Sequence, residues 1–220
     1  MSGQLLEALE PRERLSLILD RMIERYGTRP WNWHTRQRPF EVLIGTVLSQ
    51  RTRDEKTDEA AKALLSEYPT AGALVVAPLE QIERLIRPSN YYKTKAVRIQ
   101  AICRVLLDRH GGEVPRDLEP LCALPGVGRK TAACVRVYGF GEPAIPVDVH
   151  VHRLANRMGL IQTKRPEESE TALWSITDPK HVLLLNELFV KHGQTVCKPV
   201  RPECDRCGVA NLCTHGRDGD

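Results

Sequence analysis

A lysine directly behind a glycine turn is the first residue in this sequence whose setting suggests chemistry. Lys130 lies in the segment 124–131, which reads LPGVGRKT. Two glycines around one small apolar residue allow a tight turn with positive φ. They also leave backbone N–H groups exposed at the start of the next helix, so the turn could bind a DNA phosphate without base selectivity. The alternatives are a plain connection between helices, or a surface lysine that binds phosphate.

Asp148 follows Lys130 by eighteen residues, in the segment 145–153, which reads IPVDVHVHR. A lysine attacks as the neutral amine, so desolvation or a neighbouring cation such as Arg129 must lower the pKa of a nucleophilic lysine. A carboxylate beside a sugar can stabilise developing positive charge or take up protons. An anionic Asp148 close to Lys130 would favour the ammonium form, so we expect the two groups to titrate as a coupled pair.

The two histidines after Asp148 lack the spacing of a metal pair. Residues two apart on a helix, such as His150 and His152, point to different faces. We expect His150 to line the site or to cap backbone groups, and Arg153 and Arg157 to meet carboxylates or DNA.

Four cysteines near the end of the sequence form a second chemical group. Cys197, Cys204, Cys207 and Cys213 follow the pattern C-x6-C-x2-C-x5-C. Four thiolates suit either a tetrahedral zinc ion or a [4Fe–4S] cluster. Zinc sites more often contain two C-x-x-C pairs, whereas this run has one, so the spacing leans towards iron and sulfur. The other three cysteines, Cys103, Cys122 and Cys134, lie in apolar helical patterns and predict buried, inert thiols.

Composition limits the class of protein. The 220 residues are 41% hydrophobic and 27% charged, which is typical of a soluble globular protein. The net charge of +4 permits nucleic-acid binding without demonstrating it. The sequence has neither a secretory signal nor an apolar run long enough to span a membrane. We therefore expect an intracellular protein, in which clustered cysteines bind metal rather than form disulfides.

The elements that must position these residues are predicted to be helices. Apolar residues recur at helical spacing in nearly every segment. The expected helices cover residues 15–26, 40–48, 57–68, 79–86, 96–107, 118–124, 167–177 and 181–192, the last ending before Gly193. The run 144–147 contains Pro146 and follows Pro143, so it predicts a loop. The fold class is all-α, and the stretches 28–39 and 139–146 are the candidate domain boundaries.

Several of these motifs occur together and in order, and the combination resembles a known family. The glycine hairpin, Lys130 and the VDxHxxR segment at 147–153 resemble the helix–hairpin–helix DNA glycosylases, and specifically the endonuclease III family. The likeness extends from about Pro39 to Cys213. It includes LSQRTRD at 48–54, YKTKA at 92–96 and the cysteine loop.

The resemblance implies a bifunctional DNA glycosylase/AP lyase of base excision repair. In that family the residue at Lys130 attacks C1′ of the deoxyribose, with the residue at Asp148 opposite it. The resulting imine leads to β-elimination and strand cleavage. The implied substrates are oxidised or damaged pyrimidines and abasic sites in double-stranded DNA. A mismatch-specific monofunctional glycosylase, which would have serine or tyrosine at position 130, and a non-catalytic DNA-binding iron–sulfur protein are the alternatives.

Excision from a duplex requires that the damaged nucleotide be flipped out and the gap filled. The resemblance assigns the gap-filling positions to the Gln50–Arg51 loop and the Asn90–Tyr91 loop. The family commonly has Gln where Arg51 aligns, so Arg51 takes that role or Gln50 does. Tyr91 either stacks as an aromatic wedge or packs in the core beside Tyr92. The full set of predicted DNA contacts is Gln50, Arg51, Tyr91, Leu124, Gly126, Gly128, Arg129, Thr131, His150 and Lys198.

The resemblance also implies that the four cysteines hold a [4Fe–4S] cluster. The cluster would staple the C-terminal loop and present Lys198, Arg201 and Arg206 to phosphates. Residues 32–142 would form a six-helix lobe containing the helix–hairpin–helix motif. Residues 1–31 and 143–220 together would form the cluster lobe. We expect a monomer that acts in the cytoplasm and nucleoid of a prokaryote.

Overall fold

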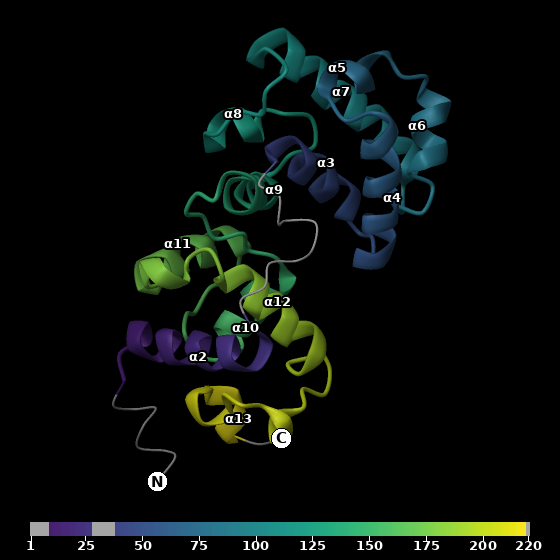
Figure 1. Ribbon diagram of the computed structural model, residues 1–220. Coiled ribbons are helices and arrows are strands. Elements are labelled where there is room, and N and C mark those ends of the chain that lie inside the picture. The colour runs from purple at the N-terminus through teal and green to yellow at the C-terminus, as the bar shows by residue number, and fades with distance from the viewer. Residues whose placement is uncertain (1–8, 28–37, 219–220) are drawn as a thin grey trace. The chain divides into compact units, whose positions relative to one another are not determined.

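The computed structural model describes residues 9–27 and 38–218, and these residues form helices joined by loops, with no strand among them (Figure 1). The prediction of an all-α fold is confirmed. The chain divides into two compact units: unit 1 comprises Met1–Pro30 and Pro143–Asp220, and unit 2 comprises Trp31–Glu142. Most of the predicted boundary at 28–39 lies outside the described residues. No described helix is long and apolar enough to cross a membrane.

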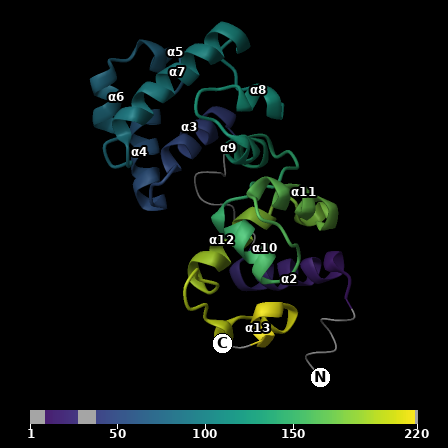
Figure 2. The same ribbon diagram turned by 180° about the vertical axis from the view of Figure 1, so that it is seen from behind.

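Unit 2 is built from seven α-helices and one π-helical segment, counted over its described residues, and Figure 2 shows them from behind. In chain order these are α3 (Pro39–Ser49), α4 (Asp54–Glu67), α5 (Ala71–Val76), α6 (Leu79–Leu85), α7 (Tyr92–His110), α8 (Leu118–Cys122), α9 (Arg129–Cys134) and η1 (Val135–Phe140). Helix α5 was not expected from the sequence, since its six residues are too few to show helical periodicity.

Helix α3 is the centre of the unit 2 core. Every residue from Val42 to Leu48 is buried, and the helix packs against α4, α7, α9 and η1. A Cβ on Gly139 would lie 2.9 Å from the Pro39 Cα, so the absence of a side chain lets η1 approach the start of α3 closely. Helix α7 is the longest described helix and extends the predicted helix over 96–107 at both ends. It ends at His110, and its C-cap Gly111 has φ of 61°. These two helices carry the loops that flank the candidate site.

Unit 1 contains the helices on either side of the cysteine loop. They are α2 (Pro11–Tyr26), α10 (Val149–Arg157), α11 (Pro166–Ile176), η2 (Pro179–His181), α12 (Leu185–Thr195), η3 (Cys204–Arg206), η4 (Ala210–Leu212) and α13 (Thr214–Asp218). Apolar side chains of α2, α10, α11 and α12 form one buried cluster, which includes Leu19, Leu154, Leu173 and Phe189. Residues 144–147 form a loop before α10, which confirms that prediction.

The predicted helix over 181–192 is wrong at both ends. The segment opens with the short 3-10 turn η2, and α12 then runs from Leu185 through Gly193 to Thr195. Gly193 does not end the helix as predicted; it lies inside α12, where helix packing requires a residue without a side chain. A Cβ there would lie 2.6 Å from His150 Nδ1 and 3.0 Å from Arg153 Nη2, so glycine allows α12 to pack closely against α10.

Candidate active site and cysteine centre

The glycine hairpin of unit 2 is anchored by its apolar residues and turns at Gly126. Leu124 and Val127 are 2% and 4% exposed, and the Val127 N–H donates to the Leu124 carbonyl at 3.1 Å. Gly126 adopts φ of 70° and is exposed, as is Gly128, the N-cap of α9. Leu124 and Thr131, two of the predicted DNA contacts, are buried as whole residues, so the structure does not expose them as it exposes the two glycines.

Lys130 is the second residue of α9 and is exposed next to the exposed Arg129. The helix begins at Arg129, and the Gly128 carbonyl accepts from the Ala132 N–H at 2.9 Å. The helical path continues from α9 directly into η1, so the lysine projects from the first turn of a segment that reaches Phe140. The hairpin thus presents two cationic side chains beside exposed turn glycines.

Asp148 lies in unit 1, at the N-terminus of α10. Its Oδ1 atom accepts from the backbone N–H groups of His150 and Val151, each at 2.9 Å. These bonds make the half-buried carboxylate the N-cap of the helix. Both capping bonds are accepted by the same oxygen of the carboxylate, Oδ1. The preceding loop is held by the Asn186 side-chain amide, which donates to the Pro146 carbonyl at 2.7 Å.

Arg153 and Arg157 bind the backbone around the first cysteine. Arg153 Nη2 donates to the carbonyls of Gly193 at 3.1 Å and Cys197 at 2.9 Å, and lies 3.1 Å from His150 Nδ1. Arg157 donates to the carbonyls of Lys198 at 2.7 Å and Pro199 at 3.0 Å. We expected these arginines to meet carboxylates or DNA, whereas the structure places them on backbone carbonyl groups. Both arginines secure the cysteine loop to α10.

The two predicted gap-filling loops of unit 2 each contain an exposed residue in the left-handed region. Arg51 has φ of 54° and Tyr91 has φ of 58°. Tyr91 is 62% exposed, so the alternative that it packs in the core is wrong, and the partly buried Tyr92 packs there instead. Non-glycine residues in this region are uncommon, and such strain concentrates at functional sites.

Gln50 is connected to the hairpin rather than directed away from it. Its Oε1 accepts from Arg98 Nη1 at 2.9 Å, and its Nε2 donates to the Gly126 carbonyl at 3.3 Å. Arg98 comes from α7 and packs so closely on Gly126 that an added Cβ would lie 2.7 Å from the guanidinium carbon. Sequence reasoning missed Arg98, whose position in the middle of an amphipathic helix gives no local signal.

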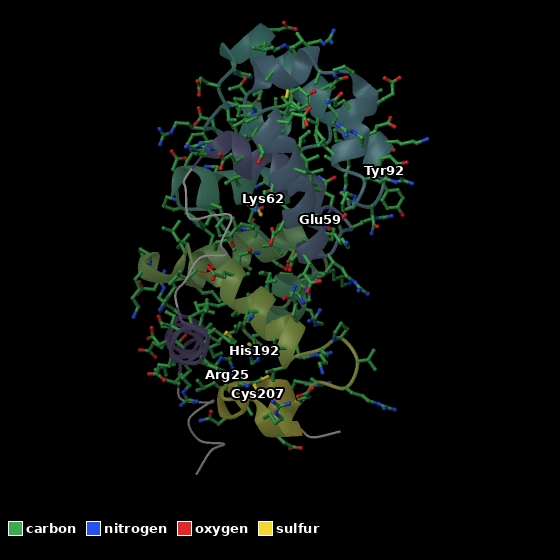
Figure 3. All side chains as sticks on the ribbon, turned by 45° about the vertical axis from the view of Figure 1, so that its right-hand side comes forward. Arg25, Glu59, Lys62, Tyr92, His192 and Cys207 are labelled. Atoms are coloured by element: carbon green, nitrogen blue, oxygen red, sulfur yellow. The ribbon has the colours of Figure 1, made fainter. Side chains whose placement is uncertain are left out.

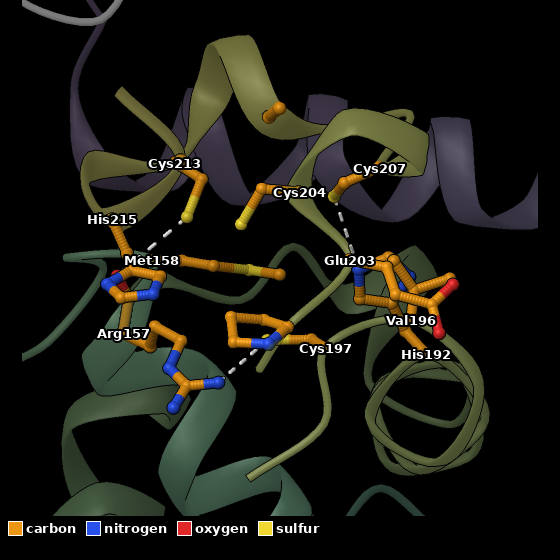
Figure 4. A pocket seen from close by; sticks show the side chains of 13 residues that line it. Arg157, Met158, His192, Val196, Cys197, Glu203, Cys204, Cys207, Cys213 and His215 are labelled. Atoms are coloured by element: carbon orange, nitrogen blue, oxygen red, sulfur yellow. Dashed lines mark hydrogen bonds between the residues drawn. The ribbon is translucent and has the colours of Figure 1, made fainter. Parts of the chain in front are cut away.

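The four clustered cysteines of unit 1 line one pocket (Figure 4). None of the seven cysteines forms a disulfide. Cys197 and Cys213 are buried, and Cys204 and Cys207 are half-buried. Burial raises the pKa of the Cys207 and Cys213 thiols, which is the cost that a bound metal must offset when it takes them as thiolates. Within the described part of the chain, no three His, Cys, Asp or Glu side chains are grouped tightly enough to hold one metal ion.

A histidine missed by sequence reasoning contacts the cysteine pocket from α12. His192 Nε2 lies 3.5 Å from Cys207 Sγ, and its Nδ1 lies 2.9 Å from the Tyr26 hydroxyl. Figure 3 shows His192, Arg25 and Cys207 gathered in unit 1. Burial, and then Arg25, lowers the pKa of His192 to about 4. The neutral ring can donate one hydrogen bond towards sulfur while its other nitrogen accepts from Tyr26.

The cations of the cysteine loop pair with an acid in the same loop. Lys198 Nζ lies 2.5 Å from Glu203 Oε1, and Arg206 Nη1 lies 2.7 Å from Glu203 Oε2. Arg201, which is exposed, has φ of 52°. Exposed ion pairs of this kind contribute little to stability.

Comparisons with known proteins define the class. Residues 44–179 match the HhH-GPD superfamily of base excision DNA repair proteins. Endonuclease III of Thermotoga maritima is 47% identical over 180 residues, which are 82% of this chain and 84% of that protein. Endonuclease III of Escherichia coli is 35% identical over 177 residues, with 80% and 84% covered.

Solved structures agree with the sequence relatives. A trapped endonuclease III–DNA covalent intermediate superposes with a TM-score of 0.86 at 34% identity, over 96% of this chain and 99% of that one. A thermostable thymine-DNA glycosylase gives a TM-score of 0.85 at 22% identity, over 95% and 98%, which shows the shared fold alone. The chain is thus a base excision repair protein of the helix–hairpin–helix class, and it belongs to the endonuclease III family.

Proposed function

We propose that Lys130 is the nucleophile and Asp148 its acidic partner in a DNA glycosylase/AP lyase that removes oxidised or damaged pyrimidines. As a member of the endonuclease III family, the chain is a bifunctional glycosylase/lyase of base excision repair that acts on DNA. The observation that carries the residue assignment is the exposure of Lys130 one residue inside α9, directly behind the exposed glycines of the hairpin.

The chemistry needs a neutral amine at the sugar. Attack of Lys130 Nζ on C1′ displaces the base, which leaves with the bonding electrons and gains a proton. Opening of the sugar ring then gives a protonated imine. Loss of a C2′ proton, assisted by the imine, forms a C2′=C3′ double bond, and the C3′–O bond breaks as the 3′-phosphate leaves with its bonding electrons. Asp148 can stabilise positive charge at C1′ or take up protons, and its N-cap bonds hold the carboxylate in a fixed orientation for either role.

Arg51 and Tyr91 are the residues that we propose fill the gap left by the flipped nucleotide. Both are exposed and both have the strained backbone expected at a functional loop. Gln50 holds the first loop against the hairpin through its bonds to Arg98 and Gly126. The hairpin glycines, with Arg129, bind phosphate, and His150 and Lys198 approach DNA from unit 1.

The four cysteines would hold a [4Fe–4S] cluster, so that unit 1 would be the cluster lobe and unit 2 the helix–hairpin–helix lobe. Zinc ligands lie about 2.3 Å from one ion, which brings the sulfur atoms to within roughly 3.8 Å of each other. A cluster bonds each thiolate to a different iron, so its ligands surround a larger volume. The four thiols that line one pocket supply the four thiolate ligands that such a cluster needs, which supports this assignment. When bound, it cross-links the loop. The bacterial relatives support action on chromosomal DNA in a prokaryotic cytoplasm.

Borohydride trapping tests the assignment, because reduction converts the imine into a stable protein–DNA bond. We expect wild-type protein to become linked to duplexes carrying an oxidised pyrimidine, and Lys130→Gln to bind the same duplex without becoming linked. Asp148→Asn should lower the rate at least about 100-fold. Lys62→Gln, which changes an exposed lysine of α4 labelled in Figure 3, is the matched control and should behave as wild type.

Each remaining outcome contradicts part of the proposal. A linked Lys130→Gln variant would show that another amine attacks. Base release by wild type without trapping would indicate a monofunctional glycosylase, and preference for mismatched thymine over oxidised pyrimidines would overturn the substrate class. DNA binding without any chemistry would leave a non-catalytic protein.

A further inference from the structure

A buried lysine connects the two gap-filling loops of unit 2. Lys95, on the first turn of α7, is 3% exposed. Its Nζ lies 2.7 Å from the carbonyl oxygens of Leu48 and Gln50, and 2.9 Å from the hydroxyl oxygens of Thr52 and Ser89. All four acceptors are uncharged. Burial, with a smaller contribution from Arg98, lowers the pKa of Lys95 to about 8. Burying an ammonium group costs free energy, so the arrangement of four oxygen atoms around Lys95 needs a structural or functional explanation.

The cage joins segments that are far apart in sequence. Leu48 and Gln50 lie at the C-terminal end of α3, where backbone carbonyls attract a positive charge. Ser89 comes from the loop before α7, and its hydroxyl also donates to the Leu48 carbonyl at 3.0 Å. Thr52 Oγ1 accepts from the Asn90 N–H at 3.1 Å. One ammonium group therefore organises both the 50–52 loop and the 89–91 loop.

Each loop carries one strained residue next to this cage. Arg51 lies between two cage residues, and its carbonyl accepts from the Asn90 side-chain amide at 2.6 Å. Tyr91 follows Asn90 directly and precedes the first residue of α7. A left-handed conformation at such residues persists only where the surroundings fix it. The Lys95 cage and the Asn90 bonds are the contacts that fix it here.

We propose that Lys95 is a positioning residue that holds Arg51 and Tyr91 together in the conformation that enters the duplex. The inference rests on the gap-filling role given to these two residues above. Lys95 itself does not attack DNA, because its ammonium is enclosed and its three N–H groups are shared among four protein acceptors. It acts through the loops that it joins.

The test compares one abasic site in two settings. In a fully paired duplex the nucleotide must be flipped and the gap filled, whereas in a mismatched bubble of a few nucleotides the stack is already open. Single-turnover strand cleavage is measured on both substrates for wild type, Lys95→Met and Gln100→Met. Gln100 is the matched control, because it lies on the same helix and its amide donates to the carbonyls of Leu74 at 3.2 Å and Ala77 at 2.8 Å, away from the two loops.

We expect Lys95→Met to slow cleavage of the duplex about tenfold to a hundredfold, as loss of geometry typically does, and to change the bubble less than about threefold. Gln100→Met should leave the ratio of the two rates at the wild-type value. If Lys95→Met lost the same fraction of its cleavage rate on both substrates, Lys95 would only stabilise the fold, and the inference would be overturned. A wild-type protein that cleaves both substrates equally fast would instead overturn the gap-filling role. Should Lys95→Met fail to fold, Lys95→Gln, which keeps two N–H donors without the charge, is measured in its place with the same criteria.

Discussion

Replacing the two hairpin glycines one at a time separates backbone strain from phosphate access. Gly126→Ala puts a Cβ on a residue with φ of 70° and drives it into the Arg98 side chain. The left-handed conformation costs about 1–2 kcal/mol for a non-glycine residue. Displacing Arg98 also removes its hydrogen bond to Gln50, which is worth about 0.5–1.5 kcal/mol. We therefore expect Gly126→Ala to lower the free energy of unfolding by about 1.5–3.5 kcal/mol.

Gly128→Ala is the matched change in the same hairpin, and we expect it to leave stability almost unchanged. At this position φ is −93°, and an added Cβ meets no atom within 4 Å. Its stability should stay within about 0.5 kcal/mol of wild type, as for other surface changes. If the exposed glycine lets a phosphate approach the backbone, the added methyl group should nevertheless lower the DNA affinity of Gly128→Ala.

Thermal unfolding and DNA binding at two salt concentrations measure these effects. For a chain of this length the Gly126→Ala loss corresponds to a fall in Tm of roughly 3–14 °C. Removing the Arg98 side chain as well gives the control: in Arg98→Ala/Gly126→Ala the clash is gone, so the added cost of Gly126→Ala should shrink to the backbone strain alone. The reasoning fails if Gly126→Ala melts within 1 °C of wild type, or if Gly128→Ala is destabilised as much, by about 2 kcal/mol or more.

Three further predictions follow from unit 1. Asp148→Asn keeps an N-cap acceptor, so its free energy of unfolding in urea should match wild type within about 0.5 kcal/mol, whereas that of Asp148→Ala should fall by about 1 kcal/mol. Equal losses in the two variants would contradict the capping role of Asp148. Burial raises the pKa of Glu187 to about 7, above its unfolded value, so the stability that this residue contributes at low pH is lost as pH rises through about 7. Glu187→Gln should therefore raise Tm at pH 8 but not at pH 4. A rise at both pH values would exclude ionisation of Glu187 as the cause. Cys204→Ser should lower bound iron and visible absorbance, while Cys103→Ser should retain both; zinc without iron in purified wild type would overturn the cluster.

The sequence determined the class of fold and the chemical candidates, because both depend on local pattern. Helical spacing of apolar residues is enough to predict an all-α chain, and the loop at 144–147 follows from Pro143 and Pro146. The glycine hairpin, Lys130, Asp148 and the four cysteines are recognised by residue type and separation. Their roles in catalysis and cluster binding stay predictions until the trapping and metal measurements are made.

Tertiary structure alone decided which polar groups serve each loop. The sequence could not separate Tyr91 from Tyr92, since their exposure depends on a core assembled from other helices. Gly193 has the sequence signal of a helix stop, yet it lies inside α12 because His150 and Arg153 pack against it. Lys95 has no motif of its own. Its four acceptors come from positions 48, 50, 52 and 89, and a buried charge is satisfied by whatever oxygen atoms the fold brings together, so only the folded chain reveals its role.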